Sequence, residues 1–385
     1  MKNRFNKEVA RDIVDNLEMR VYTSQILGQD SNLVLHGGGN TSFKDSQTLH
    51  VKGSGWNLDT IAKEGFSPVS LMKLAKMATL ESLSDSDMVK QQREALRNPK
   101  APNPSVEAIL HAIIPFCFVD HTHSDAVVTI SNTPEGEKLI KELYPNFMII
   151  PYVMPGFILA KEIYEYSLKQ PFDSVEGIIL LNHGIFTYDD DAETSYNKMI
   201  DAVNIAEKFL DEKAPLKIED IETKEFDYES LKEILSSIKG YECVVKVNSS
   251  PLAKFFASQK NVNELSKKGI LTPEHIIRTK RYPMLIDEDI PTAVATYVKE
   301  YMEYFNSHKK DETMLNPAPM WAVIKGVGTV SFGKNEKEAN IIEDINNHTM
   351  KAILQAEQLG GFESISVKDG FEMEYWELEQ AKLKK

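Results

Sequence analysis

The segment GIILLNHG, residues 177–184, is an apolar run that ends in a histidine and a glycine. Such a short apolar run is typical of a buried strand, so we expect His183 at the carboxyl end of a strand inside an α/β sheet. The segment FVDHTHSDAVV, residues 118–128, predicts a second strand that carries His121 and His123. Residues i and i+2 of a strand point to the same face, so both imidazoles can reach one ion.

The three histidines are therefore candidate ligands of a catalytic metal ion. Three histidine ligands with an open fourth position are the arrangement that keeps zinc reactive. Glu107 follows Ser105 and Val106 and adds a carboxylate. A carboxylate beside the ion can bind it at rest and move a proton once substrate arrives. A single histidine is more often a core or surface group, and a glutamate in a first helical turn can simply complement the helix dipole.

Two further side chains have open roles. Ser105 is expected to be an N-cap, and Pro115 to end the short helix that begins there. On that helix Glu107 and His111 are four apart and share a face, so His111 is either a plain helix-face residue or a support for the site. Asp120 either orients an imidazole through its free nitrogen or caps the strand.

Two small-residue turns, GGNTS (38–42) and GSG (53–55), carry hydroxyl groups. Glycine lets backbone amides approach an anion closely, and Ser and Thr add donors. With Ser105 at a helix start and Lys52 nearby, the turns are candidate phosphate contacts, although such loops are common as plain turns. Neither turn matches the Walker or the dinucleotide fingerprint.

Composition restricts the class of protein. A chain of 385 residues predicts two domains, and a net charge of −14 argues against a nucleic-acid partner. The sequence has only two cysteines, which fits a reducing cytoplasm. Neither an apolar signal-peptide core near the N-terminus nor a run of about 18 apolar residues is present, so we expect a soluble cytoplasmic protein with no membrane partner.

Strands and helices are expected to alternate up to about residue 212, which is the pattern of an α/β sandwich. A charged stretch at 213–240 suggests a boundary, giving domains 1–220 and 221–385. The expected elements of the first part are a helix at 8–27, strands at 31–35 and 49–52, and helices at 69–80 and 86–97. Those of the second are strands at 243–248 and 321–325 and helices at 251–257, 290–306 and 336–358.

An internal repeat links the two parts. The segment 177–188 matches 321–332, and each precedes a predicted long helix. Aligning Gly184 with Gly328 sets His183 opposite Val327. The second domain is therefore predicted to be a smaller α/β domain, a degenerate repeat of the first without the metal ligands.

Taken together, these motifs resemble the class II aldolase/adducin family. This family includes zinc-dependent fuculose- and rhamnulose-1-phosphate aldolases and ribulose-5-phosphate 4-epimerase. The chain is most similar to the aldolase half of bifunctional rhamnulose-1-phosphate aldolase/lactaldehyde dehydrogenase proteins. The matching stretches span nearly the whole chain: LVLHGGGNTSFK (33–44), VKGSGWNL (51–58), PSVEAILHAIIP (104–115), VDHTHSDAV (119–127), LLNHG (180–184), LTPEHIIRTKRYP (271–283) and FEMEYWELEQAKL (371–383).

The resemblance implies an αβα sandwich and assigns a role to each candidate site residue. Zinc would be held by His121, His123 and His183, and Glu107 would be the acid/base and a resting-state ligand. The residues implied around the substrate phosphate and its neighbouring oxygens are Asn40, Ser54, Gly55 and Ser105. Val106 stands where fuculose-type aldolases have a second serine, a departure that affects one phosphate contact. Imidazole also suits other first-row divalent metals.

The implied reaction is cleavage of a ketose 1-phosphate to dihydroxyacetone phosphate and a short aldehyde. Alternatives within the superfamily are a 4-epimerase, a decarboxylase or a dehydratase; the epimerases carry aspartate where Glu107 stands. A non-enzymatic adducin-like module is disfavoured because the ligand histidines are present. Relatives are ring-shaped homo-oligomers, commonly tetramers, so the resemblance implies self-association. In relatives a tyrosine, sometimes from a neighbouring subunit, takes the proton of the C4 hydroxyl. Because the bifunctional proteins continue where this chain stops at Lys385, no dehydrogenase activity is expected.

Overall fold

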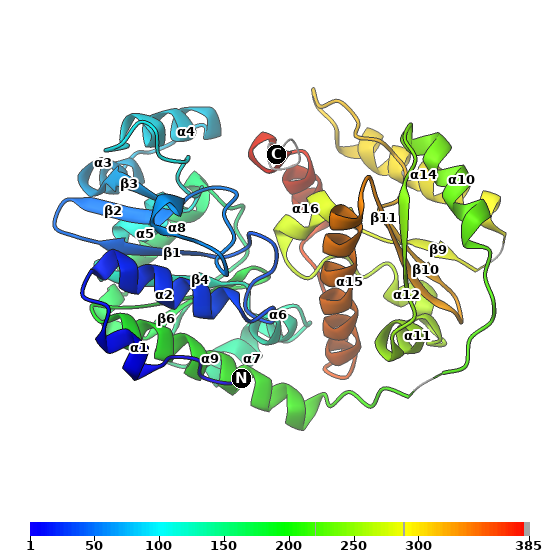
Figure 1. The fold of residues 1–385 in the computed structure, drawn as a ribbon, viewed down its shortest axis with the longest axis horizontal. Helices are drawn as coiled ribbons and strands as arrows, with labels where there is room; N and C mark the ends of the chain where they lie inside the picture. The colour runs from blue at the N-terminus through cyan, green and yellow to red at the C-terminus, as the bar shows by residue number, and fades with distance from the viewer. Residues whose placement is uncertain (220, 288, 381–385) are drawn as a thin grey trace. The chain divides into compact units, whose positions relative to one another are not determined.

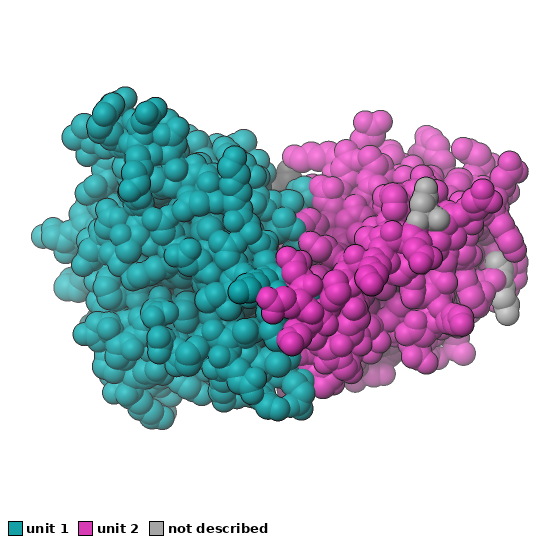
Figure 2. All heavy atoms as spheres, turned by 90° about the horizontal axis from the view of Figure 1, so that it is seen from below, with its two compact units in different colours: residues 1–131, 135–210 teal, residues 132–134, 211–385 magenta. Residues whose placement is uncertain are grey.

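The computed structural model describes residues 1–219, 221–287 and 289–380, which form two compact units (Figure 2). Unit 1 holds Met1–Ser131 and Glu135–Leu210, and unit 2 holds Asn132–Pro134 and the chain from Asp211 onward. The predicted division between 220 and 221 falls beside residue 220, which lies outside the described residues. That boundary stays a prediction.

Unit 1 is built on a seven-stranded sheet in the order β3-β2-β1-β4-β7-β6-β5. All neighbouring strands are antiparallel except β5 and β6, which run parallel. The strands are β1 (Asn40–Lys44), β2 (Thr48–Lys52), β3 (Phe66–Ser70), β4 (Phe118–Thr122), β5 (Met148–Ile150), β6 (Gly177–Leu180) and β7 (Gly184–Asp189). The two predicted strands are therefore β4, which contains His121 and ends just before His123, and β6, which ends before the turn that contains His183.

The register assigns side chains of β1 and β4 to two faces. Asn40 lies opposite His121 on one face, and Thr41 lies opposite Asp120 on the other. Helix α5 (Ala108–Ile113) contacts the first face through His111, and α2 (Asn16–Gly28) and α9 (Ala192–Lys213) contact the second. Unit 1 thus has the predicted αβα layers, which Figure 1 shows in blue to green. Its other helices are α1 (Lys7–Arg11), α3 (Leu71–Ala78), α4 (Asp85–Glu94), α6 (Asp125–Ser131), α7 (Gly136–Leu143) and α8 (Phe157–Ser167), of which α3 and α8 pack against α5.

Four local predictions for unit 1 were wrong. The segment expected as a strand at 31–35 is a turn, closed by Leu33 N donating to Asp30 O. Its apolar side chains are buried because the turn packs on the end of β4, where His123 N donates to Leu33 O. The single helix expected at 8–27 is divided into α1 and α2, and the first two residues of the helix expected at 69–80 belong to β3. The N-cap of α5 is Glu107, two residues after the predicted Ser105.

Unit 2 contains a four-stranded sheet in the order β8-β11-β10-β9. Its strands are β8 (Val244–Asn248), β9 (Met284–Ile286), β10 (Trp321–Ile324) and β11 (Gly328–Gly333). One face packs on α10 (Tyr228–Lys239) and α14 (Ile290–His308), and the other packs on α11 (Pro251–Ala257) and α15 (Glu336–Glu357). The remaining helices are α12 (Val262–Leu265), α13 (Ile276–Thr279), α16 (Val367–Glu374) and α17 (Glu377–Gln380).

The charged stretch at 213–240 includes helix α10. Leu231 and Leu235 of this helix are fully buried against the sheet of unit 2. Its charged residues lie mostly on the opposite side, so average charge concealed an amphipathic helix.

The predicted repeat is confirmed by topology. In unit 1, β4, β7 and β6 are antiparallel neighbours, and β5 at the edge runs parallel to β6. In unit 2, β8, β11 and β10 are antiparallel neighbours in the same way, and β9 at the edge runs parallel to β10. Both β6 and β10 have four residues. A helix of 22 residues follows β7 and β11 alike. Even the strained turn position is shared, since Asn182 has φ +59° and its equivalent Gly326 has φ +72°. The second domain is therefore a structural copy of part of the first.

Among the described residues, no helix combines the length and the apolar character needed to cross a membrane.

Candidate metal centre

Three imidazoles converge in unit 1 at the end of β4 and in the turn between β6 and β7. One ligand nitrogen from each of His121, His123 and His183 lies within 4.8 Å of the others. The Nε2 atoms of His121 and His123 are 3.0 Å apart. His121 is fully buried, His183 is nearly so, and His123 is half-buried. The structure thus brings together the three histidines that the sequence singled out.

The tautomer of His121 follows from its surroundings. Its Nδ1 lies 3.0 Å from the carbonyl oxygen of Ile185, which can only accept a hydrogen bond, so Nδ1 carries the proton. Its ring also stacks on Phe186, with centroids 3.9 Å apart. Nε2 is therefore left with a lone pair that faces the other two histidines, as metal ligation requires.

The turn that delivers His183 leaves no room for a side chain at the next position. A Cβ atom on Gly184 would lie 2.4 Å from the carbonyl oxygen of Thr122 and 3.0 Å from the His121 ring. Asn182 takes the left-handed conformation, with φ +59°, and its amide donates to Ser131 Oγ at 3.0 Å. This tight turn, recorded in the sequence as LLNHG, sets His183 beside His121.

Glu107 stands beside the histidines and is 5% exposed. Its Oε2 lies 3.5 Å from His121 Nε2, and its Oε1 lies 3.8 Å from His183 Nε2. Asn40 Nδ2 donates to Oε2 at 2.5 Å. Oε1 is buried and has no hydrogen-bond partner within the described part of the chain. One carboxylate oxygen is thus fixed, and the other faces the imidazoles.

A hydrogen-bond chain behind Glu107 fixes its position. Because Asn40 Nδ2 donates to Glu107, its Oδ1 must accept from Nε2–H of His111. Nδ1 of His111 is then bare and accepts from the hydroxyl of Ser42, at 2.8 Å. Desolvation by burial holds the pKa of His111 well below its usual value, so the ring is neutral. His111 therefore supports the site through Asn40, the second of its two predicted roles.

The candidate phosphate contacts lie on two adjoining segments. An isolated bridge pairs Gly53 with Pro104, and Ser54 N donates to Asn103 O at 2.8 Å. The Ser105 amide donates to Lys52 O, and its hydroxyl accepts from the Glu107 amide at 3.3 Å. Gly55 follows Ser54 in the left-handed region, with φ +86°. These hydrogen bonds hold the segment with Ser54 and Gly55 against the segment with Ser105, which lies two residues before Glu107.

Lys52, considered above as a positive charge near the candidate phosphate contacts, is engaged by the backbone. Its side chain is nearly buried, and Nζ donates to the carbonyl oxygens of Gly37 and Gly39 at 2.7 and 2.9 Å. It thereby braces the glycine-rich loop that precedes Asn40.

Asp120 does not orient an imidazole, and it does not cap its strand. Because strand neighbours point to opposite faces, its carboxylate faces α2 and α9, away from His121. It accepts from Arg20 Nη2 and from Ser195 Oγ, each at 2.5 Å. Arg20 is fully buried and also contacts the carbonyl oxygens of Ser42 and Val119. This buried ion pair joins α2 and α9 beneath the strands that carry the site, and no sequence motif signalled it.

The donor set fits a divalent metal ion. Three imidazole nitrogens converge beside Glu107, one of whose carboxylate oxygens faces them without a hydrogen-bond partner among the described residues. Three histidine ligands are typical of catalytic zinc sites, and the other first-row metals also accept imidazole. In unit 2 the positions equivalent to the three histidines are Val247, Ser249 and Val327, as the strand registers show. The second copy cannot hold the same ion.

We expect replacement of His111 by Phe to lower kcat by about tenfold, while KM changes little. Phe fills the space but cannot donate to Asn40, so Glu107 loses its fixed orientation; outer-shell changes of this kind commonly reduce activity or metal affinity by about 10–100-fold. Steady-state kinetics on metal-loaded protein would measure the effect. His111→Gln, which retains a donor, should recover part of the rate, and a wild-type kcat in His111→Phe would contradict the positioning role.

Comparison with known proteins identifies the family of both parts of the chain. The family described as class II aldolase and adducin N-terminal domain matches residues 19–210, and the one described as aldolase class II, second domain, matches residues 224–383. The N-terminal class II aldolase domain of a conserved protein from Thermoplasma acidophilum is 35% identical, with a TM-score of 0.50; the match covers 55% of this chain and 99% of that one. The chain belongs to the class II aldolase/adducin family.

Two other relatives are more distant. An uncharacterized oxidoreductase, YuxG of Bacillus subtilis (strain 168), is 28% identical over 418 residues, and the match covers all of this chain and 60% of that protein. This chain therefore spans less than two thirds of that relative. L-fuculose-1-phosphate aldolase from Thermus thermophilus is 14% identical with a TM-score of 0.36, covering 50% of this chain and 92% of that one. That likeness is too remote to bear on the reaction.

Proposed function

We propose that this protein is a metal-dependent aldolase that cleaves a ketose 1-phosphate to dihydroxyacetone phosphate and a short aldehyde. The observation that carries the proposal is the convergence of His121, His123 and His183 within 4.8 Å, with the carboxylate of Glu107 beside them. Membership of the class II aldolase/adducin family supports a lyase reaction at this centre. The preferred ion is zinc.

His121, His123 and His183 would hold the ion. When bound, the ion supplies a Lewis acid that stabilises the negative charge developing on the substrate as the C3–C4 bond breaks. The proton of the C4 hydroxyl leaves to a base that the described residues do not identify, and the electrons of the broken bond stay on the fragment that contains C3.

Glu107 would return a proton to C3. Its Oε2 is engaged by Asn40, so Oε1, which faces the imidazoles without a hydrogen-bond partner among the described residues, is the oxygen that can carry the proton. Ser54, Gly55 and Ser105 would bind the phosphate, because their segments are tied together by backbone hydrogen bonds and bring amides and hydroxyls to one place. Asn40 serves both as the anchor of Glu107 and as a neighbour of the substrate oxygens.

The proposal is tested with a substrate panel on protein of defined metal content. Rhamnulose, fuculose and 5-deoxyribulose 1-phosphates are offered to zinc-loaded and chelator-treated enzyme, and dihydroxyacetone phosphate is measured by NADH oxidation with added glycerol-3-phosphate dehydrogenase. We expect release from at least one sugar, loss on chelation and recovery on zinc addition. Formation of an epimer, carbon dioxide or water-loss product in place of dihydroxyacetone phosphate would assign another reaction of the superfamily, and inertness toward all three would refute the proposal.

We further propose that the protein self-associates, with a tetramer favoured by the family resemblance. Light scattering coupled to size exclusion measures the mass directly, and a monomer at micromolar concentration would exclude this part of the proposal.

A further inference from the structure

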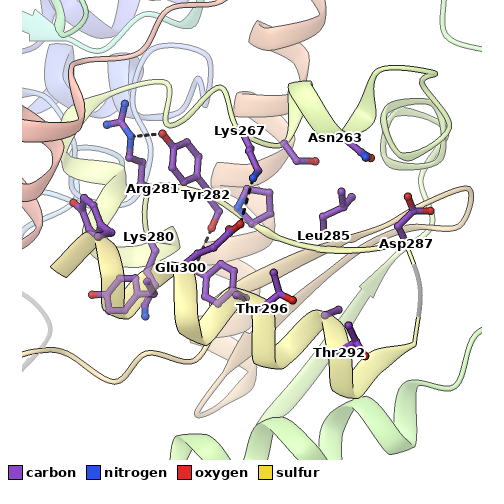
Figure 3. A pocket seen from close by; sticks show the side chains of 16 residues that line it. Asn263, Lys267, Lys280, Arg281, Tyr282, Leu285, Asp287, Thr292, Thr296 and Glu300 are labelled. Carbon is purple, nitrogen blue, oxygen red and sulfur yellow. Dashed lines mark hydrogen bonds and ion pairs between the residues drawn. The ribbon is translucent and has the colours of Figure 1, made fainter. Parts of the chain in front are cut away.

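Unit 2 contains a cavity of about 410 Å³, within the size range of small-molecule sites. One wall is the outer side of α14, with Thr292, Thr296 and Glu300, and another is the segment around β9, including Leu285 (Figure 3). The third wall comes from α12 and the residues after it, including Ser266. The equivalents of the metal ligands, Val247, Ser249 and Val327, are not among its lining residues.

The aromatic wall of this cavity is fixed from behind. Arg281 Nε donates to the hydroxyl of Tyr282 at 2.8 Å, and the Tyr297 hydroxyl donates to Tyr282 O at 3.2 Å. Arg281 is itself held by the carbonyl oxygens of Ile365 and Ser366, at 2.7 and 3.0 Å. The Tyr282 ring therefore has one orientation before any ligand arrives, which reduces the entropy lost on binding.

Backbone strain accompanies this arrangement. Lys280 has φ 58° and ψ 178°, a conformation that is essentially confined to glycine and unfavourable by about 1–3 kcal/mol for other residues. Its Nζ donates to Asn316 O at 2.6 Å and lies 3.4 Å from the centre of the Tyr301 ring. A glycine at this position would be free of the strain. Such strained positions cluster at ligand clamps and active sites.

A buried hydroxyl in the wall lacks a partner. Ser266 is 4% exposed, and its Oγ has no hydrogen-bond partner in the part of the chain that the structure describes. Leaving a buried hydroxyl unpaired is unfavourable by about 1–3 kcal/mol. Ser266 is among the residues that line the cavity, so rotation of its side chain toward the cavity would let a ligand hydroxyl or carbonyl oxygen satisfy it.

The charged groups around the cavity already have partners within the protein. Lys267 is paired with Glu300 at 3.4 Å, and Asp287 is paired with Lys325 at 2.6 Å. The Arg281 guanidinium is occupied by two carbonyl oxygens and a tyrosine hydroxyl. Desolvation by burial lowers the pKa of Lys280 to about 7, so even this amine is not a full cation at neutral pH. The cationic groups of the wall are thus already engaged by protein partners, which favours a neutral ligand over a phosphate.

From these features we infer that unit 2 has a ligand site of its own, for a neutral, hydroxyl-rich compound about the size of a monosaccharide. Tyr282 and Tyr301 contribute aromatic rings to the lining, and Ser266, Thr292, Thr296 and Asn263 contribute hydroxyl and amide groups. Flat apolar faces and single polar groups together match a sugar, whose ring has apolar faces and hydroxyl edges. The inference is independent of the proposed reaction, since it involves no residue of the metal centre.

The experiment is binding of unphosphorylated L-rhamnose, L-fucose and glycerol to the full-length, chelator-treated protein, measured by ligand-observed NMR and calorimetry. We expect at least one of the two sugars to bind. Ser266→Ala should weaken that binding about two- to tenfold, the range that one hydrogen bond supplies. The same substitution removes an unpaired buried hydroxyl, so the thermal unfolding midpoint should stay unchanged or rise.

A blocking variant completes the test. Thr296→Trp adds bulk from an exposed position of α14 into the cavity, and it should abolish binding without unfolding the chain. Absence of binding by both sugars, equal affinity in wild type and both variants, or binding of inorganic phosphate instead would each overturn the inference. Aldol cleavage should be unaffected in Ser266→Ala, so failure here is distinguishable from failure of the proposed function.

Discussion

The Glu107→Gln variant should lose dihydroxyacetone phosphate release by about 10²–10⁴-fold in kcat, the range that a positioned acid or base contributes. Glutamine has the same shape and can still contact Asn40, but it cannot give a proton to C3. Because the three histidines are untouched, zinc content measured by elemental analysis should stay close to that of the wild type. The substitution therefore separates proton transfer from metal binding.

Matched variants sharpen this result. Glu137→Gln changes an exposed glutamate that pairs with Lys141 on α7, and it should leave kcat unchanged. Glu107→Asp keeps the carboxyl group but shortens it, so the contacts with Asn40 and the imidazoles cannot both be maintained. We expect its kcat to fall between those of the wild type and Glu107→Gln. More than a tenth of wild-type kcat in Glu107→Gln would contradict the assigned role.

The sequence was informative wherever a short pattern has one structural consequence. Strand alternation places His121 and His123 on one side, and the turn after β6 places His183 next to them; the structure shows both. The repeat anticipated β10, β11 and α15, because an apolar run, a glycine turn and a long helix recur in the same order.

The sequence was uninformative where a structure depends on distant partners or on averaged properties. Arg20 and Asp120 are 100 positions apart, and nothing local marks them as a pair. Asp120 next to an HxH motif suggested a link to the imidazoles that the pleat of the strand forbids. The turn at 31–35 looked like a strand because its apolar residues are buried, although the burial comes from packing on β4.

The buried pair of Arg20 and Asp120 gives the largest expected effect on stability. Both side chains are fully buried and joined at 2.5 Å. Arg20→Met leaves the carboxylate in the interior without its cation, and removal of one partner of such a pair typically lowers the unfolding free energy by about 3–5 kcal/mol. The double variant Arg20→Met/Asp120→Asn has no uncompensated charge, because an amide can still accept from Ser195, so we expect it to recover most of the loss.

Unfolding of unit 1 can be followed by itself. The chain has three tryptophans, and Trp56 is in unit 1 whereas Trp321 and Trp376 are in unit 2. With the latter two replaced by Phe, urea titration monitored by tryptophan fluorescence reports unit 1 alone. Lys141→Met, which breaks an exposed pair, should change the unfolding free energy by less than about 1 kcal/mol. If Arg20→Met were no worse than Lys141→Met, or the double variant no better than the single, the ion pair would not be what secures α2 and α9 beneath the metal centre.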